Sequence, residues 1–241
     1  MPALKLRVIA FDRPGYGLSD PAPRRTSWQD LAADVGELAT HLGLHRFPIV
    51  GVSGGGPLAT ACARFMPERV SALALISSVP PPEWVDRGGL GLLMRLGRWP
   101  AMARPTMAMA RRLLLSPAWA ENLVFGGLLK GRDAEVMTHD RRAMLLSAMR
   151  EGLGRTAQGA MADAGRYGRP WGFRPRDIAV PTTIWQGDED PLIPWESSEA
   201  FSSIPGSTLR IMPGEGHYSL AIGRAQIILA DLLAQAGSRL D

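Results

Sequence analysis

Short apolar runs rich in β-branched residues recur along the chain, separated by segments of helical periodicity. Such runs are typical of strands in a parallel sheet, where helices cover both faces. The sequence predicts five strands, at Leu6–Phe11, Phe47–Val52, Arg69–Ser77, Pro181–Gly187 and Thr208–Met212. We expect them to form a single parallel sheet.

Helical patterns occupy most of the intervals. From Ser27 to Leu42 apolar residues recur on one face, Ser27 and Asp30 have the spacing of a capping box, and Gly43 follows the end. Further helices are predicted in the small-residue segment that ends near Met66, at Trp195–Ser203 and at Ser219–Ala236. The alternation of strand and helix predicts an α/β fold with a doubly wound parallel sheet.

One long segment interrupts this alternation. From Glu83 to about Arg174 no strand pattern occurs, and Asp133–Met149 is the clearest helix. We interpret this segment as an inserted helical cap. The chain then divides into residues 1–82 and 176–241, which form the core, and residues 83–175, which form the cap.

The apolar side chains of this segment allow two interpretations. Its methionines and Trp84, Trp99 and Trp119 could line an apolar substrate pocket, because thioethers and large rings fill irregular cavities. The same residues could equally form the contacts between the cap helices. We expect the cap as a whole to cover the functional site.

The chemistry is centred on the stretch from Phe47 to Met66, where a strand, a glycine-rich turn and a helix follow one another. Gly51-Val-Ser-Gly-Gly55 has the G-x-S-x-G pattern of a turn that exposes a serine nucleophile between strand and helix. The spacing alone is weak evidence in a glycine-rich chain, and the glycines could merely let the helix cross the strand. The strand before Ser53 and the helix after it favour the nucleophile.

A serine hydroxyl needs a base to accept its proton and a carboxylate to orient that base. Of the four histidines, only His217 follows a predicted sheet strand on a loop, the position where sites in open α/β sheets form. Three carboxylates, Asp188, Glu189 and Asp190, lie in the loop after the preceding strand. The residue pattern does not choose among these three.

The composition argues against several other classes of protein. The net charge is +4, but the 25 arginines and two lysines are scattered and form no basic stripe, so we expect no nucleic-acid partner. The single cysteine, Cys62, excludes an internal disulfide and a cysteine-rich metal site. No leader pattern or long apolar run occurs, so we expect a cytoplasmic protein without membrane insertion.

Four pieces of the sequence together resemble the α/β-hydrolase superfamily, in particular its cap-bearing esterase, haloperoxidase and peptidase-like branch. They are Asp12-Arg-Pro-Gly-Tyr-Gly-Leu-Ser-Asp20, Gly51-Val-Ser-Gly-Gly55, Gly187-Asp-Glu-Asp-Pro-Leu-Ile-Pro194 and Gly214-Glu-Gly-His217. Their order is the family's order of nucleophile, acid and histidine. The resemblance covers essentially all residues outside the cap.

The resemblance implies a role for each candidate residue. Ser53 is the nucleophile, His217 the general base and then acid, and Asp190 the orienting carboxylate, with Asp188 as the runner-up. The backbone N–H of Gly54 donates to the oxyanion. No cofactor or metal is implied.

The beginning of the chain departs from the family. Members ordinarily carry three strands before the Asp12–Asp20 loop, and a His-Gly loop that supplies a second oxyanion N–H; no His-Gly dipeptide occurs here. Loss of one such donor costs about a hundredfold to a thousandfold in rate. We therefore expect an upstream segment to belong to the working protein.

These features predict a cofactor-independent serine hydrolase that cleaves a small or medium apolar ester through an acyl-enzyme on Ser53. The sequence defines neither the acyl group nor the oligomeric state, and ester, amide and thioester stay open. The competing interpretation is a non-catalytic protein, either a degraded paralogue or a ligand-binding receptor. Acyl transfer to an acceptor other than water is a weaker third one.

Overall fold

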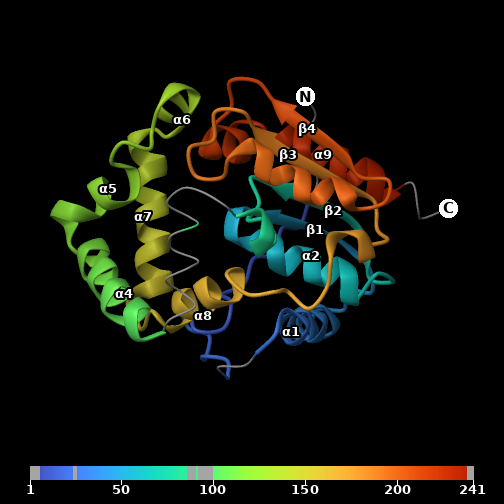
Figure 1. Ribbon diagram of the computed structural model, residues 1–241, viewed down its shortest axis with the longest axis horizontal. Helices are drawn as coiled ribbons and strands as arrows, with labels where there is room; N and C mark the ends of the chain where they lie inside the picture. The colour runs from blue at the N-terminus through green and yellow to red at the C-terminus, as the bar shows by residue number, and fades with distance from the viewer. Residues whose placement is uncertain (1–5, 24–25, 86–90, 92–99, 238–241) are drawn as a thin grey trace.

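The computed structural model describes residues 6–23, 26–85, 91 and 100–237 (Figure 1). Within them four parallel strands form one sheet, in the order β1-β2-β3-β4. The strands are β1 (Phe47–Val52), β2 (Val70–Ile76), β3 (Thr182–Gly187) and β4 (Thr208–Met212). The predicted doubly wound α/β class is confirmed, because helices cover both faces of this parallel sheet.

Alternate residues of the strands point to two separate hydrophobic layers. Leu73 and Leu75 of β2 pack in the layer that includes helices α1 and α2, whereas Ala74 and Ile76 pack in the layer that includes α9. These helices are α1 (Trp28–His41), α2 (Gly56–Phe65) and α9 (Ala225–Gly237) (Figure 1). All residues of β2 are buried, as the continuous apolar run predicts for a central parallel strand.

The strand predicted at Leu6–Phe11 does not form. The structure assigns these residues to no strand, and the side chains of Val8 and Phe11 are 76% and 41% exposed. A strand needs a neighbour that pairs with its backbone groups and helps to cover a face, and the described residues provide none for this segment. The prediction of five strands was therefore wrong.

The same lack of a neighbour changes the environment of β1. Among the described residues this strand pairs with β2 alone, so it lies at the edge of the sheet, and Val52 is 40% exposed. The sequence predicted a strand buried on both faces, because Ile49, Val50 and Val52 form a β-branched run. An apolar run indicates that a segment favours a strand, whereas burial of that strand also requires neighbouring strands on both sides.

The start of α1 forms as its sequence predicts. The Ser27 hydroxyl accepts a hydrogen bond from the Asp30 N–H (3.1 Å), and the Asp30 carboxylate accepts one from the Ser27 N–H (2.7 Å). These reciprocal bonds satisfy two backbone donors that a helix start otherwise leaves free. The buried face of α1 then includes Leu31 and Val35.

The α-helices α4 to α8 lie between β2 and β3 in the chain, and together we call them the helical insertion. They are α4 (Pro100–Leu115), α5 (Pro117–Phe125), α6 (Gly131–Val136), α7 (His139–Gly154) and α8 (Gln158–Tyr167). Figure 1 shows α4 to α7 grouped to one side of the sheet layers. The predicted division into core and cap at residues 83 and 175 stays a prediction.

The single helix predicted at Asp133–Met149 is two helices, α6 and α7. The chain leaves the helical conformation at Met137 and Thr138. The Thr138 N–H donates to the Val136 carbonyl, and the Thr138 hydroxyl caps α7 by accepting the Arg141 N–H. The periodicity of apolar residues continues across this break, but a capping threonine starts a new helix. Trp84 and Trp119 are 44% and 59% exposed, and Trp99 lies outside the described residues.

The remaining predicted helices form with altered geometry. Trp195–Ser203 is a 3-10 helix, and the last helix begins with a π-helical turn at Ser219–Gly223 before α9. Short 3-10 turns are present at η1 (Ser53–Gly55), η2 (Pro82–Trp84) and η3 (Pro175–Asp177). No helix among the described residues has the length and apolar character needed to cross a bilayer.

Candidate active site

The three residues predicted to act together all follow the carboxyl ends of sheet strands. Ser53 comes directly after β1, Asp190 follows β3, and His217 follows β4. In a parallel sheet the carboxyl ends of all strands lie on the same side, and α/β proteins assemble their sites there. We call this side of the sheet the sheet edge. The remaining histidines, His41, His45 and His139, are exposed.

Ser53 has a backbone conformation that side chains rarely adopt. Its φ is +51°, in the left-handed region, which costs a non-glycine residue about 1–3 kcal/mol. The turn is tight enough that a Cβ on Gly51 would lie 2.7 Å from the Cα of Gly56, and a Cβ on Gly56 would meet the Ser78 side chain. This geometry is that of a sharp strand-to-helix turn that presents a serine.

The peptide group after Ser53 is held in one orientation. The Ser53 carbonyl accepts a hydrogen bond from the Val79 N–H (3.1 Å), in the segment that follows β2. In a trans peptide the Gly54 N–H points to the opposite side, so this bond fixes its direction and polarises it as a donor. This is the N–H predicted to bind the oxyanion.

The next carbonyl is held by two side chains from distant parts of the chain. The Gly54 carbonyl accepts hydrogen bonds from the Tyr167 hydroxyl (2.7 Å) of α8 and from Arg13 Nη1 (2.9 Å). Burial raises the pKa of Tyr167 to about 12, so this phenol is a neutral donor at pH 7. A Cβ on Gly54 would lie 2.6 Å from the Tyr167 oxygen, which explains the glycine at this position.

Arg13 is itself fixed by a buried carboxylate of the helical insertion. Asp163 lies 3.1 Å from Arg13 Nη1, pairs with Arg166 at 2.8 Å and accepts the Tyr16 hydroxyl at 3.0 Å. Burial opposes the charge of Arg13, but Tyr167, Asp163 and Tyr16 outweigh it and raise the arginine pKa. The Asp12–Asp20 loop is thereby attached to both the serine turn and α8.

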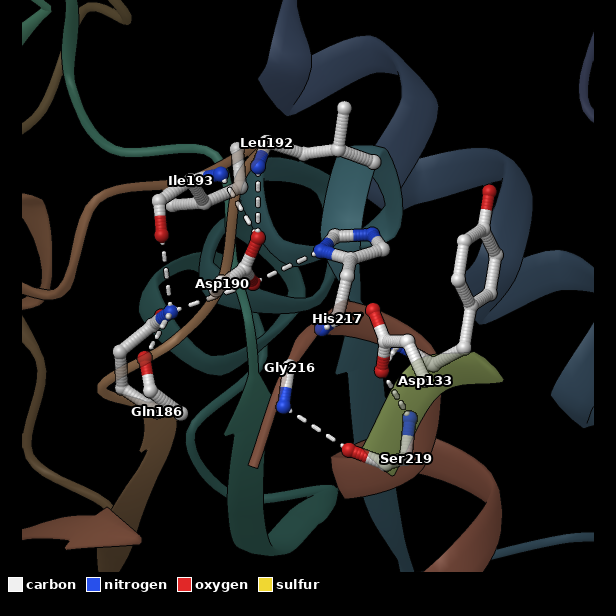
Figure 2. Close-up of polar contacts among 10 residues, drawn as sticks. Asp133, Gln186, Asp190, Leu192, Ile193, Gly216, His217 and Ser219 are labelled. Atoms are coloured by element: carbon white, nitrogen blue, oxygen red, sulfur yellow. Dashed lines mark hydrogen bonds and ion pairs between the residues drawn. The ribbon is translucent and has the colours of Figure 1, made fainter. Parts of the chain in front are cut away.

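Asp190 and His217 form a buried pair. The Asp190 Oδ2 lies 2.8 Å from His217 Nδ1, and the two residues are 7% and 6% exposed (Figure 2). Asp190 Oδ1 accepts the N–H groups of Leu192 (2.8 Å) and Ile193 (2.9 Å). The carboxylate is thus anchored on one oxygen and faces the imidazole with the other.

These contacts keep Asp190 ionised. Burial opposes its charge, but the hydrogen bond and charge of His217, with the Ile193 and Leu192 N–H groups, outweigh it and lower the pKa of Asp190. A carboxylate at Nδ1 holds the tautomer in which Nε2 is free to accept a proton.

The structure distinguishes the three candidate carboxylates. Asp190 contacts the His217 imidazole, whereas Asp188 and Glu189 are exposed. Asp188 instead accepts the Gly214 N–H (2.7 Å). Only a carboxylate that turns into the sheet edge can reach the imidazole, and the backbone bonds within the Asp190–Ile193 turn provide that direction. Local sequence does not contain this information.

Ser53 is connected to the Asp190–His217 pair through two hydrogen bonds and an apolar contact. Val79, which bonds the Ser53 carbonyl, packs in one cluster with Ile193, whose N–H bonds Asp190. Within the described residues the Ser53 hydroxyl makes no hydrogen bond to His217. Such bonds are often long or absent before substrate binds.

Sequence reasoning missed Gln186 as a member of the site. It is fully buried at the end of β3, and its Nε2 donates to Asp190 Oδ2 (3.2 Å) and to the Ile193 carbonyl (2.9 Å). A polar residue at the end of a buried strand is the signal that could have indicated it. Arg13 and Tyr167 were also missed, because their partners are distant in sequence.

No metal-ligand cluster is present in the parts of the chain that the structure describes: no three His, Cys, Asp or Glu side chains are close enough to hold an ion. Cys62 is buried in α2, and burial raises the pKa of its thiol to about 12. This cysteine is therefore a protonated core residue.

Comparisons with known proteins identify the family of the chain. A family model described as alpha/beta hydrolase fold matches residues 1–223. The chain is 29% identical to a proline iminopeptidase of Neisseria gonorrhoeae, over 95% of this chain and 78% of that protein. It is also 29% identical to a non-heme haloperoxidase of Rhodococcus erythropolis, over 95% of this chain and 81% of that protein.

Among solved structures, an esterase from Exiguobacterium antarcticum superimposes with a TM-score of 0.63 at 19% identity. The match covers 92% of this chain and 78% of that one. At this identity the likeness concerns the fold alone.

Proposed function

Because the chain belongs to the alpha/beta hydrolase fold family, we propose that it is a cofactor-independent serine hydrolase that cleaves a small or medium apolar ester. The observation that carries the proposal is the buried 2.8 Å contact between Asp190 and His217, at the sheet edge that also carries the strained Ser53 turn. Strained backbone of this kind is concentrated at functional sites, and at Ser53 it accompanies the strand-to-helix turn of a nucleophile motif.

The reaction uses the three side chains in sequence. His217 accepts the Ser53 proton at Nε2 while the serine oxygen attacks the ester carbonyl carbon. Asp190 stabilises the imidazolium, which then protonates the leaving alcohol and leaves an acyl group on Ser53. Water, deprotonated by the same imidazole, hydrolyses this acyl-enzyme and releases the acid.

The negative charge that develops on the carbonyl oxygen needs a fixed donor. We assign that role to the Gly54 N–H, whose direction the Val79–Ser53 hydrogen bond supports. The donor needs no reorganisation during the reaction, because the Gly54 carbonyl is held by Tyr167 and Arg13 as well.

We propose that the helical insertion covers this site, as expected for a cap. Its α8 contributes Tyr167 to the serine turn, and its α6 contacts the His217 backbone. The insertion has a buried apolar core that includes Met137, Leu146 and Phe125 and packs against Tyr218, the neighbour of His217. The apolar substrate and the cytoplasmic location stay predictions.

A non-catalytic role is the second candidate. One observation favours it: among the described residues the Gly54 N–H is the single oxyanion donor that we assign, beside an unpaired sheet edge at β1. Loss of a second donor would slow turnover by about a hundredfold to a thousandfold and leave ligand binding intact.

A fluorophosphonate probe separates these two functions. We expect it to add one covalent group to the wild-type protein, measured as an intact mass shift, and to leave Ser53→Ala unlabelled. The exposed Ser202→Ala variant is the matched control and should be labelled like wild type. Absence of labelling in a folded wild-type protein, or equal labelling of Ser53→Ala, would refute the hydrolase proposal.

A further inference from the structure

A buried carboxylate of the helical insertion binds the backbone of the candidate base. Asp133 of α6 is 1% exposed, and its Oδ2 accepts the His217 N–H at 3.0 Å. Its Oδ1 accepts the N–H groups of Tyr218 (3.0 Å) and Ser219 (2.7 Å). Figure 2 shows this carboxylate beside His217, on the side away from Asp190.

These three N–H groups open a helical segment. Helical conformation begins at His217, and the first N–H groups of a helix have no partner within it. Usually a side chain just before the helix caps them, but here that position is Gly216, which has no side chain. Asp133 replaces this local cap from 84 residues upstream.

The Asp133 carboxylate occupies the space that a side chain at position 216 would need. A Cβ on Gly216 would lie 2.5 Å from the Asp133 Cγ, closer than real Cβ atoms approach. The φ of Gly216 is not in the left-handed region, so its backbone conformation does not by itself require glycine. The absence of a side chain there makes room for Asp133.

The residue before Asp133 forms a second attachment to the same loop. Arg132 Nε lies 3.2 Å from Glu215 Oε1, which also pairs with Arg224 at 2.6 Å. Burial opposes the charge of Glu215, but hydrogen bonds from Ser219 and Arg224 and the two arginine charges lower its pKa. Adjacent residues of α6 therefore hold both ends of the Glu215–Ser219 segment.

From this geometry we propose that Asp133 is a positioning residue for His217, an inference that rests on the proposed hydrolase function. Asp190 fixes the imidazole at Nδ1, and Asp133 fixes the backbone from which that imidazole projects. The alignment of the base then depends on the packing of the helical insertion against the His217 loop. A misplacement of about 1 Å at such a group can cost about a hundredfold in rate.

Asp133→Asn tests the bond to His217 selectively. The asparagine carbonyl can keep the two bonds at the Oδ1 side, from Tyr218 and Ser219, whereas its NH2 group would face the His217 N–H. We expect fluorophosphonate labelling of Ser53 to slow by about tenfold to a hundredfold at every pH tested. Asp140→Asn, an exposed carboxylate in α7, is the matched control and should label at the wild-type rate.

Gly216→Ala provides the second variant if Asp133→Asn does not fold. It keeps every polar group but displaces the Asp133 carboxylate, so it should slow labelling in the same way. A melting temperature measured for each variant confirms that the labelled protein is folded. Wild-type labelling rates in folded Asp133→Asn or folded Gly216→Ala would overturn the proposal.

Histidine-selective 15N NMR separates this inference from the hydrolase proposal. The Nδ1–H proton of His217, identified by its loss in His217→Gln, should be protected from exchange in wild type and exchange faster in Asp133→Asn. This measurement needs no covalent reaction, so it applies even if wild-type Ser53 proves unreactive. Unchanged exchange in folded Asp133→Asn would overturn the positioning role.

Discussion

At the scale of single residues, the site depends on side-chain atoms that make more than one hydrogen bond. Asp190 uses one oxygen for the Leu192 and Ile193 N–H groups and the other for His217 and Gln186. The sequence could name Asp190 through the family resemblance, but the residue pattern alone left Asp188 and Glu189 as alternatives. Side-chain direction decided among them, and direction follows from the folded turn.

Asp190→Asn should nearly abolish activity, although its NH2 group would also replace the acceptor of the Gln186 amide. The amide oxygen can keep the Leu192 and Ile193 bonds, so the NH2 group would face His217 Nδ1 and favour the tautomer that carries its proton on Nε2. That tautomer cannot accept the Ser53 proton. We expect labelling of Ser53 to slow by about a thousandfold to ten thousandfold, measured as the rate of mass shift.

The exposed Asp188 supplies the control for this substitution. Asp188→Asn keeps an oxygen for the Gly214 N–H and does not contact the imidazole, so it should label at the wild-type rate. A folded Asp190→Asn variant that also labels at the wild-type rate would contradict the assigned role of Asp190.

At the scale of helices and strands, local patterns predicted elements well where local contacts form them. The capping box of α1 is one example, because Ser27 and Asp30 satisfy each other's backbone groups whatever lies around them. The break between α6 and α7 is the opposite case. The apolar spacing runs through Thr138, and it is the bonding of that residue that ends one helix and starts the next.

Ser27→Ala should destabilise the protein by about 1 kcal/mol, because it leaves the Asp30 N–H without its cap acceptor. Urea unfolding followed by circular dichroism measures this change. The exposed Ser202→Ala variant, which removes a hydroxyl outside α1, should unfold at the wild-type urea concentration. Equal stability of Ser27→Ala and wild type would show that the cap contributes nothing to the fold.

At the scale of the whole molecule, the helical insertion is attached at two places on the sheet edge. Through α8 it holds the serine turn at Gly54, and through α6 it holds the loop at Glu215 and His217. These attachments are polar, and the one at Glu215 depends on an ionised carboxylate. The stability of the molecule should therefore depend on pH.

The lowered pKa of Glu215 determines the direction in which stability changes with pH. Its pKa is lower in the folded protein than its ordinary value of 4.5, so its contribution is fully present above that value and is lost as pH falls through the folded pKa. The lowered pKa of Asp190 acts in the same direction below its ordinary 3.8. We expect the melting temperature to fall steeply below about pH 4.5.

Glu215→Gln tests the contribution of this carboxylate. The variant should melt at a lower temperature than wild type at pH 7 and show a shallower decrease towards pH 3, because the titrating group is gone. Glu199→Gln, an exposed carboxylate of the Trp195–Ser203 turn, is the control. Parallel melting curves for Glu215→Gln and wild type across this pH range would contradict the assignment.

The sequence by itself determined the class of fold, the positions of strands β1 to β4 along the chain and the candidates Ser53 and His217. These follow from periodicity and from motifs whose parts are close in the chain. Only the tertiary structure decided that Leu6–Phe11 forms no strand and which residues contact His217. Strand formation requires a neighbour, and Asp133 reaches the His217 loop from 84 residues away. Both depend on which segments folding brings together, and no local pattern encodes that.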